Sequence, residues 1–94
     1  MVKENVLLDK TFGFASRIVN LYKFLYKEER DMSKQLLRSG TAIGAISEEA
    51  IGAQSTSAFI NKLSIAYKVT RETLYWLRLL KSTEYLSDIQ FDSI

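Results

Sequence analysis

The stretch LLRSGTAIGAISEEAIGAQS, from Leu36 to Ser55, decides between two kinds of structure for this chain. It contains Gly40, Gly44 and Gly52, and glycine ordinarily interrupts regular structure. Apolar residues nevertheless recur around these glycines at close to helical spacing. The stretch is therefore either a glycine-rich loop that holds a ligand or a helix with a glycine face.

The loop interpretation lacks the parts that phosphate binding needs. A phosphate-binding loop has the pattern G-x-x-x-x-G-K-[ST] after a buried strand, so that backbone amides and a lysine meet the phosphates. No lysine follows Gly44 within reach, and nothing before it resembles an apolar strand. The fingerprint G-x-G-x-x-G of dinucleotide-binding proteins is also absent. We therefore expect neither a cofactor nor a small-molecule substrate here.

The helix interpretation explains the glycines as a packing surface. Gly40 and Gly44 are four residues apart and lie on one helix face, which Thr41, Ala42 and Ala45 extend with small side chains. Each glycine costs about 1 kcal/mol relative to alanine. A flat face lets a neighbouring helix approach closely, and burying one additional Leu or Phe contributes about 1.5–3 kcal/mol. The sequence therefore predicts a helix packed closely on its glycine face.

Hydrophobic periodicity divides the 94 residues into three helical segments. We predict helices over about 6–29, 33–53 and 56–82, followed by a loop and the stub of a fourth helix over 83–94. Asp31 or Ser33 is the expected N-cap of the second helix, and Ser55 that of the third. The absence of proline suits long uninterrupted helices. These features predict a single all-α domain, an antiparallel up-down bundle of the four-helix type whose fourth helix is missing or truncated.

The third segment has more apolar circumference than a helix of a small monomer buries. Residues to one side of its central seam are Ile60, Tyr67 and Leu74, and those to the other side are Ile65, Val69 and Trp76. Either this helix is central and well covered, or a second face packs against another subunit. We expect self-association, with Trp76 among the packing or interface residues.

Composition argues against catalysis and metal binding. The chain contains no cysteine and no histidine, so the commonest general base and the commonest metal ligand are missing. The neighbouring Glu48 and Glu49 point about 100° apart on a helix and do not converge. We therefore predict no enzyme, no metal site and no catalytic residues. The chain also lacks a run of about 18 apolar residues, so we expect a cytoplasmic protein with no membrane contact.

Basic residues concentrate on the third predicted helix. Lys68, Arg71, Tyr75 and Arg78 follow one another at steps of three, four and three, which places them in one stripe, with Lys81 a little further round. Such a stripe neutralises phosphates while the tyrosine stacks on a base. The alternative is a solvated face that keeps the protein in solution. A rival of another class is a structural or protein-interaction module that binds no nucleic acid.

Two further charged residues are candidates for helix packing or an interface. Arg38 lies between small residues and is expected to reach Glu49 or Glu72, or to line a subunit interface, in preference to a direct RNA contact. Glu49 is expected to pair with a base or accept a hydrogen bond. Both therefore join Gly40 and Gly44 as residues that hold helices together.

The opening stretch resembles the core LLRSGTSIGANI-x-EA…AQS of the bacterial four-helix-bundle proteins encoded within intervening sequences of 23S ribosomal RNA genes. The resemblance continues through FINKLSIAYKVTRETLYWLRLLKSTEYLS, residues 59–87, and LLDKTFGFASRIVNLYKFL, residues 7–25. This chain departs from the pattern at Ala42, which replaces a common serine, and at Ile46 and Ser47, where the family usually has Asn and Ile.

The resemblance implies an arrangement and a class of partner. Family members normally continue beyond the position of Ile94 with a fourth amphipathic helix, so we expect an apolar groove that another subunit covers. A structurally similar relative, the accessory protein of diversity-generating retroelements, is understood as a pentameric ring with a basic surface that binds nucleic acid. The resemblance thus implies a homo-oligomer, a pentamer by analogy, that contacts RNA or DNA.

Overall fold

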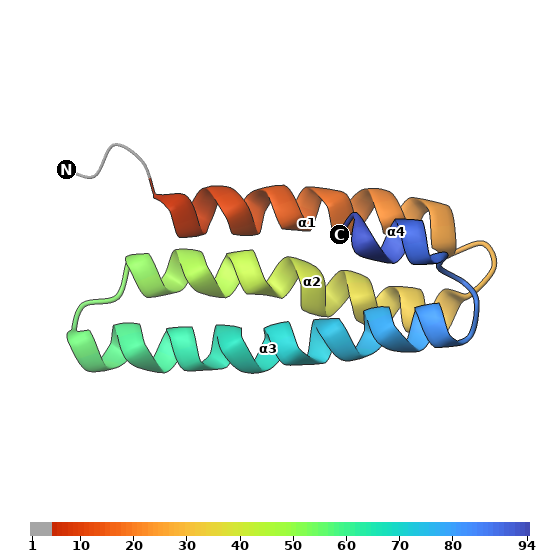
Figure 1. Ribbon diagram of the computed structural model, residues 1–94. Coiled ribbons are helices and arrows are strands. Elements are labelled where there is room, and N and C mark those ends of the chain that lie inside the picture. The colour runs from red at the N-terminus through yellow and green to blue at the C-terminus, as the bar shows by residue number, and fades with distance from the viewer. Residues whose placement is uncertain (1–4) are drawn as a thin grey trace.

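The computed structural model describes residues 5–94, which form four helices and no strands. The long helices are α1 (Val6–Leu25), α2 (Arg30–Ile51) and α3 (Thr56–Ser82), and α4 (Asp88–Asp92) is short. Helix α2 lies beside both α1 and α3, and consecutive long helices run in opposite directions (Figure 1). The predicted all-α class is confirmed.

The glycine stretch is helical, as predicted. Helix α2 continues through Gly40 and Gly44, and no glycine among the described residues has a positive φ. Gly40 is buried against Ile18 of α1, so close that an added Cβ would lie 2.9 Å from both Cγ atoms of that isoleucine. At Gly44 an added Cβ would lie 3.5 Å from the Thr11 carbonyl oxygen, which is an ordinary contact distance. The glycine face is therefore the surface on which α1 packs.

Helix α2 supplies the middle of the core. Its buried residues are Ser33, Leu36, Ser39, Gly40, Ile43, Ser47 and Ala50. Most of these side chains are small, which lets the neighbouring helices approach, while Leu36 joins the central cluster with Ile18 and Leu80. The buried hydroxyl of Ser47 donates to the Ile43 carbonyl at 2.8 Å, so its burial leaves no donor unpaired.

The first connection differs from the prediction. Helix α1 ends at Leu25, four residues early, because the amides of Glu28 and Glu29 both donate to the Leu25 carbonyl and close a turn. Helix α2 then begins at Arg30, and its N-cap is Glu29, which accepts a 2.6 Å hydrogen bond from the Met32 amide. The predicted caps Asp31 and Ser33 were wrong. Glutamate is not among the preferred N-cap residues, and the residues on both sides of the connection are strong helix formers. The sequence therefore gives no local signal that one helix ends and the next begins here.

The second connection carries the predicted cap, and the helix ends nearby differ slightly from their predicted positions. Ser55 caps α3 by accepting a hydrogen bond from the Ala58 amide. Helix α2 ends at Ile51, two residues before the predicted end. The stub of a fourth helix predicted within 83–94 is the short helix α4, which begins at Asp88. Its cap is Ser87.

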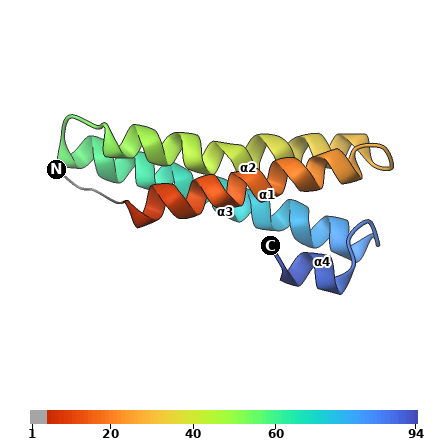
Figure 2. The ribbon, with the colours of Figure 1, turned by 90° about the horizontal axis from the view of Figure 1, so that it is seen from above.

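A tight turn after α3 places α4 against the core. Glu84 adopts a left-handed backbone with φ of 70°, the Glu84 amide donates to the Lys81 carbonyl and the Tyr85 amide donates to the Leu80 carbonyl. This pair of bonds is the Schellman arrangement that reverses a chain after a helix. Phe91 and Ile94 consequently pack against the core cluster. Figures 1 and 2 show α4 near one end of the long helices only.

The central helix is α2, and the sequence-based alternative of a well-covered α3 is wrong. No Cα atom of α1 lies within 8 Å of one in α3, so the side of α3 that faces away from α2 is uncovered along most of its length. Ile60, Tyr67 and Leu74 of α3 are accordingly 59%, 62% and 50% exposed. Within residues 5–94, none of the helices combines the length and apolarity that crossing a membrane requires.

Candidate functional site

The basic stripe lies on the outer side of α3. Lys68, Arg71, Tyr75 and Arg78 are all exposed, and their three- and four-residue spacing keeps them opposite the buried seam of the helix. We call these four residues the basic face. Within the described part of the chain, none of its three cations lies within 4 Å of a carboxylate. Their charge is therefore not neutralised by ion pairs with the protein.

Aromatic rings hold parts of the basic face in place. The guanidinium of Arg71 lies 6.0 Å from the ring centroid of Tyr67, a distance at which cation–π attraction operates. The ring of Tyr75 meets Trp76 edge to face, with centroids 5.1 Å apart and an interplanar angle of 74°. Tyr75 remains 54% exposed, so its side chain is accessible from the solvent. The basic face thus offers cations and a stacking surface together.

Lys81, the fifth candidate of the predicted stripe, has a different environment. Its Nζ lies 3.6 Å from the Asp88 carboxylate and 4.5 Å from the ring centroid of Phe91. Both partners belong to α4, so Lys81 fastens α4 to α3 and its charge is partly neutralised. Arg78 and Tyr75 lie with Lys81 around a hollow of about 690 Å³ between α3 and α4.

Arg38 pairs with Glu72 and so ties α2 to α3. The guanidinium of Arg38 forms an ion pair with the Glu72 carboxylate and also donates to Gln35 Oε1 at 3.0 Å. Trp76 Nε1–H donates to the same carboxylate at 2.9 Å. This hydrogen bond from Trp76, together with the nearby Arg38 charge, holds the pKa of Glu72 below its ordinary value, although desolvation acts in the opposite direction.

The remaining acidic residues from the sequence analysis are Glu48 and Glu49. Glu49 pairs with Lys62 of α3 at 2.7 Å, a second tie between α2 and α3, and Glu48 is exposed beside it. Among residues 5–94, no three Asp or Glu side chains lie close enough together to hold a metal ion. Glu49 and Glu72 therefore each tie α2 to α3 through an ion pair, whereas Glu48 is exposed.

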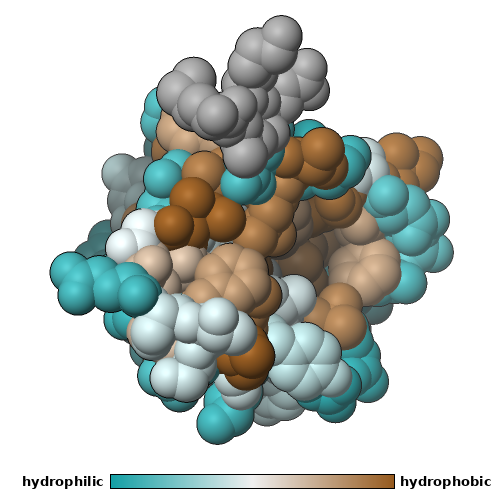
Figure 3. All heavy atoms as spheres, turned by 90° about the vertical axis from the view of Figure 1, so that its left-hand side faces the viewer, coloured by the Kyte–Doolittle hydropathy of each residue, from teal (hydrophilic) through white to brown (hydrophobic). Residues whose placement is uncertain are grey.

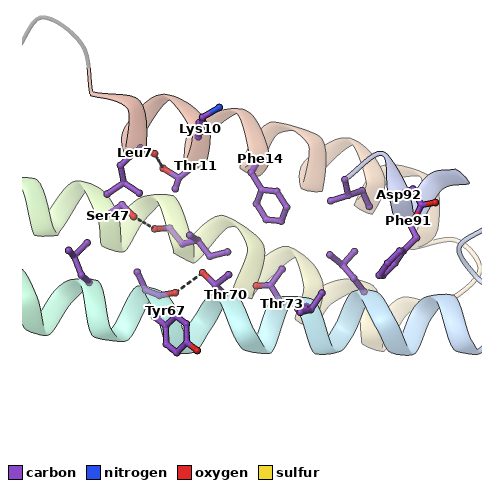
Figure 4. A pocket seen from close by; sticks show the side chains of 16 residues that line it. Leu7, Lys10, Thr11, Phe14, Ser47, Tyr67, Thr70, Thr73, Phe91 and Asp92 are labelled. Carbon is purple, nitrogen blue, oxygen red and sulfur yellow. Dashed lines mark hydrogen bonds between the residues drawn. The ribbon is translucent and has the colours of Figure 1, made fainter. Parts of the chain in front are cut away.

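An apolar groove of about 730 Å³ opens between α1 and α3, as the sequence led us to expect. Its walls include Leu7 and Phe14 of α1 and Leu74 of α3, and its floor includes Ile43 of α2. In Figure 4 the Phe14 ring projects from α1 into the space between the helices, and seen from the end in Figure 3 hydrophobic atoms surround a recess.

The hydroxyl groups in this groove are already hydrogen bonded. Thr11 donates to the Leu7 carbonyl at 2.9 Å, and Thr70 donates to the Ala66 carbonyl at 2.8 Å (Figure 4). Ser47 likewise bonds within its own helix. Because these hydroxyl groups donate to backbone carbonyls, they do not need a polar partner in the groove, and the groove suits an apolar occupant.

The sequence analysis did not single out Lys10 and Arg17, two cations of α1. Lys10 lines the groove from α1, with its ammonium directed outward in Figure 4. Arg17 is exposed seven residues, or two turns, further along the same helix stripe. The seven-residue spacing was visible in the sequence, but only the structure shows that Lys10, at one end of this stripe, lines a groove.

These features define a small all-α protein in which three long helices leave an apolar groove beside a basic helix face. Residues 3–94 match the model of the 23S rRNA-intervening sequence proteins, and the chain belongs to this family. The crystal structure of an S23 ribosomal protein family member from Bacteroides thetaiotaomicron, described as having unknown function, is similar at 59% sequence identity and a TM-score of 0.91. The match covers 94% of this chain and 83% of that chain. No curated protein matches the chain.

Proposed function

We propose that this protein is a non-enzymatic, self-associating helical protein that contacts the backbone of RNA or DNA through the basic face. The observation that carries the proposal is the set of three exposed cations, Lys68, Arg71 and Arg78, aligned without carboxylate partners among the described residues. Phosphates bind such a surface by displacing condensed counterions, without reading sequence. The open ring of Tyr75 between Arg71 and Arg78 adds a stacking surface for a base.

Self-association would strengthen this weak surface. Large apolar side chains outside the groove remain exposed, among them Ile89 at 82%, Phe12 at 74% and Phe24 at 61%, which favours contacts with other copies. A ring of subunits, such as the pentamer suggested by the retroelement accessory protein, would repeat the basic face and multiply its field. The alternating directions of α1, α2 and α3, and the open side between α1 and α3, further support an up-down arrangement of the four-helix type.

The test is filter retention of a labelled single-stranded RNA by the purified protein. Changing Lys68, Arg71 and Arg78 together to glutamate should abolish retention at low salt. Retention by the unchanged protein should fall steeply between 50 and 200 mM salt, by roughly tenfold or more for three phosphate contacts.

The matched control separates the basic face from net charge. Lys23→Glu, Lys27→Glu and Lys34→Glu makes the same charge change at exposed positions on α1, the first connection and α2. This variant should keep most of the retention. Equal loss in both variants, or unchanged retention in the first, would reject the basic face. Sedimentation showing a stable monomer at micromolar concentration would reject self-association.

A further inference from the structure

We propose that the hollow between α3 and α4 holds one unpaired base, so that the protein binds single-stranded nucleic acid in preference to a duplex. This inference rests on the proposed contact between the basic face and phosphates, and it adds the class of nucleic acid that this surface selects. Three observations carry it: the aromatic ring on the wall of the hollow, the cations that lead to the hollow, and the charges on its two edges.

The hollow is an opening on the outer side of α3, distinct from the groove between α1 and α3. Its wall on α3 includes Tyr75, Leu79 and Ser82, and its wall on α4 includes Phe91, which lines both openings. Successive residues of a helix point about 100° apart, so Tyr75 faces a different direction from Leu74, which lines the groove. The volume of about 690 Å³ falls within the range of about 300–1,000 Å³ that is usual for small-molecule sites.

Tyr75 is the stacking surface of the hollow. Its side chain is 54% exposed, and its ring meets that of Trp76 edge to face with centroids 5.1 Å apart. The indole of Trp76 is itself held by its hydrogen bond to Glu72 at 2.9 Å. A ring held in this way loses little freedom when a base packs on it, which lowers the cost of binding. Because every base has a π-face, the hollow should accept any base.

A base can reach Tyr75 only when it is unpaired. In a duplex the bases are paired and stacked between the two backbones, and taking one out of the stack is costly. A ring on the side of a straight helix therefore meets the phosphates of a duplex but not the faces of its bases. In a single strand the base faces are accessible for stacking. Tyr75 should thus add affinity for a single strand and none for a duplex, whereas the cations of the basic face serve both.

The cations of the basic face lead along α3 to the hollow. Lys68 and Arg71 precede it on the helix, and Arg78 lines it. Ten residues separate Lys68 from Arg78, which is about 15 Å at 1.5 Å per residue. A strand of several nucleotides spans that distance, but a free nucleotide does not. An occupant that uses the hollow and all three cations is therefore a strand.

The charges at the two edges of the hollow set the orientation of the strand. Arg78 lies on the edge formed by the basic face, whereas Asp88 lies on the α4 edge with its side chain 84% exposed. Lys81, the other cation of the hollow, is partly neutralised by Asp88, whose carboxylate is 3.6 Å from its Nζ. Phosphates are attracted to Arg78 and repelled by Asp88. The backbone should therefore follow the Arg78 edge, with one base directed into the hollow over Tyr75.

The experiment measures the binding of two fluorescent RNAs to the 94-residue protein by anisotropy at low salt. One is a single strand of about 12 nucleotides without self-complementarity, a length within the usual range for one single-strand site, and the other is the same strand paired with its complement. Tyr75→Leu should weaken the single strand by at least about fivefold, the effect of losing one stacked base, and should leave the duplex unchanged. Tyr75→Phe keeps the ring and should keep both affinities.

Two further variants locate the base. Ser82→Leu fills part of the hollow without changing its charge, so it should weaken the single strand several-fold and leave the duplex unchanged. The control, Tyr26→Leu, removes an exposed tyrosine that does not line the hollow and should change neither affinity. Circular dichroism establishes that each variant keeps its helix content.

The single tryptophan of the chain reports the contact directly. The Trp76 ring lies 5.1 Å from that of Tyr75, so a base packed on Tyr75 should change the tryptophan emission. The single strand should produce this change with the unchanged protein but not with Tyr75→Leu, and the duplex should produce it with neither. This measurement separates stacking from a purely structural role of Tyr75.

Several results would overturn the inference. If Tyr75→Leu weakens neither RNA, or weakens both equally, then Tyr75 does not hold an unpaired base. Unchanged affinity in Ser82→Leu would place the base outside the hollow. If adenosine monophosphate displaces the single strand at micromolar concentration, the occupant is a free nucleotide. Binding of neither RNA by the unchanged protein would reject the nucleic-acid proposal together with this inference, whereas binding of both RNAs without an effect of Tyr75→Leu would reject this inference alone.

Discussion

The two sides of α1 differ in how the chain uses its apolar residues. Toward α2, Ile18 is fully buried and lies against Gly40 with no space for another atom. Toward α3, Leu7 and Phe14 border a groove in which Leu74 of the opposite wall is 50% exposed. We call the first the closed side and the second the open side. The closed side buries its apolar residues completely, whereas the open side leaves apolar side chains partly exposed.

Truncation of a buried leucine should give the largest effect on the closed side. Leu36 of α2 is fully buried in the central cluster. Leu36→Ala should lower the free energy of unfolding by about 2–5 kcal/mol, because it removes transferred apolar surface and leaves a cavity. Urea denaturation followed by circular dichroism measures the change.

The matched change on the open side is Leu74→Gln. Its side chain is half exposed and lacks a covering element, so the free energy of unfolding should change by no more than about 0.5 kcal/mol. A loss in Leu74→Gln as large as that in Leu36→Ala would mean that the groove is packed in solution, and the contrast between the two sides would be wrong.

The two glycines of α2 sharpen the comparison within the closed side. A methyl group at Gly40 would lie 2.9 Å from two carbons of Ile18, a stiff side chain that cannot swing away. Gly40→Ala should therefore destabilise the fold by about 1–3 kcal/mol, in spite of the higher helix propensity of alanine. At Gly44 the nearest atom would be 3.5 Å away, so Gly44→Ala should be neutral or stabilising by up to about 1 kcal/mol.

Thermal unfolding of the two alanine variants tests this difference in sign. Ile18→Ala removes both Cγ atoms that the new methyl group would meet, so Gly40→Ala should cost less stability in the Ile18→Ala background than in the unchanged protein. Equal stability of the two alanine variants would show that Ile18 does not press on Gly40, and the close approach of α1 to α2 would lose its explanation.

Much of the fold could be predicted from the sequence because its signals are local. The stripe from Leu36 to Ile43 and the four-residue spacing of Gly40 and Gly44 indicated a helix with a packed small-residue face, which the structure has. The end of α1 could not be predicted, because Glu29 caps α2 from within a run of strong helix formers. The left-handed turn at Glu84 could not be predicted either, because the residue in this conformation is usually glycine and here it is glutamate.

The candidate site was only partly predictable for a different reason. Helical spacing was enough to align Lys68, Arg71, Tyr75 and Arg78, because all lie on one helix. It was not enough to place Lys81 against α4, since that contact depends on the turn after α3. Lys10 and Tyr67 line the same groove although they lie far apart in the chain, and only tertiary structure brings them to the same opening.

A small effect is expected for the polar tie between α2 and α3. Trp76 and Arg38 hold the pKa of Glu72 below its ordinary value of 4.5. Ionised Glu72 therefore stabilises the fold at pH values above 4.5, and this contribution is lost as the pH falls through the lower pKa of the folded state. Because the side chain is 35% exposed, solvent screens the pair, and Glu72→Gln should cost about 0.2–1 kcal/mol at pH 7.

Urea denaturation at a series of pH values from 7 down to 3 isolates this contribution. The difference between the unchanged protein and Glu72→Gln should shrink as the solution becomes more acidic and should vanish once Glu72 is protonated in both the folded and unfolded states. Trp76→Phe removes the hydrogen bond that contributes most to the lowered pKa while keeping an aromatic ring, so it should reproduce much of the lost pH dependence. A constant difference between the two proteins across this range would show that Glu72 is not stabilised in its ionised form. The contact between α2 and α3 would then be held by apolar packing without help from this ion pair.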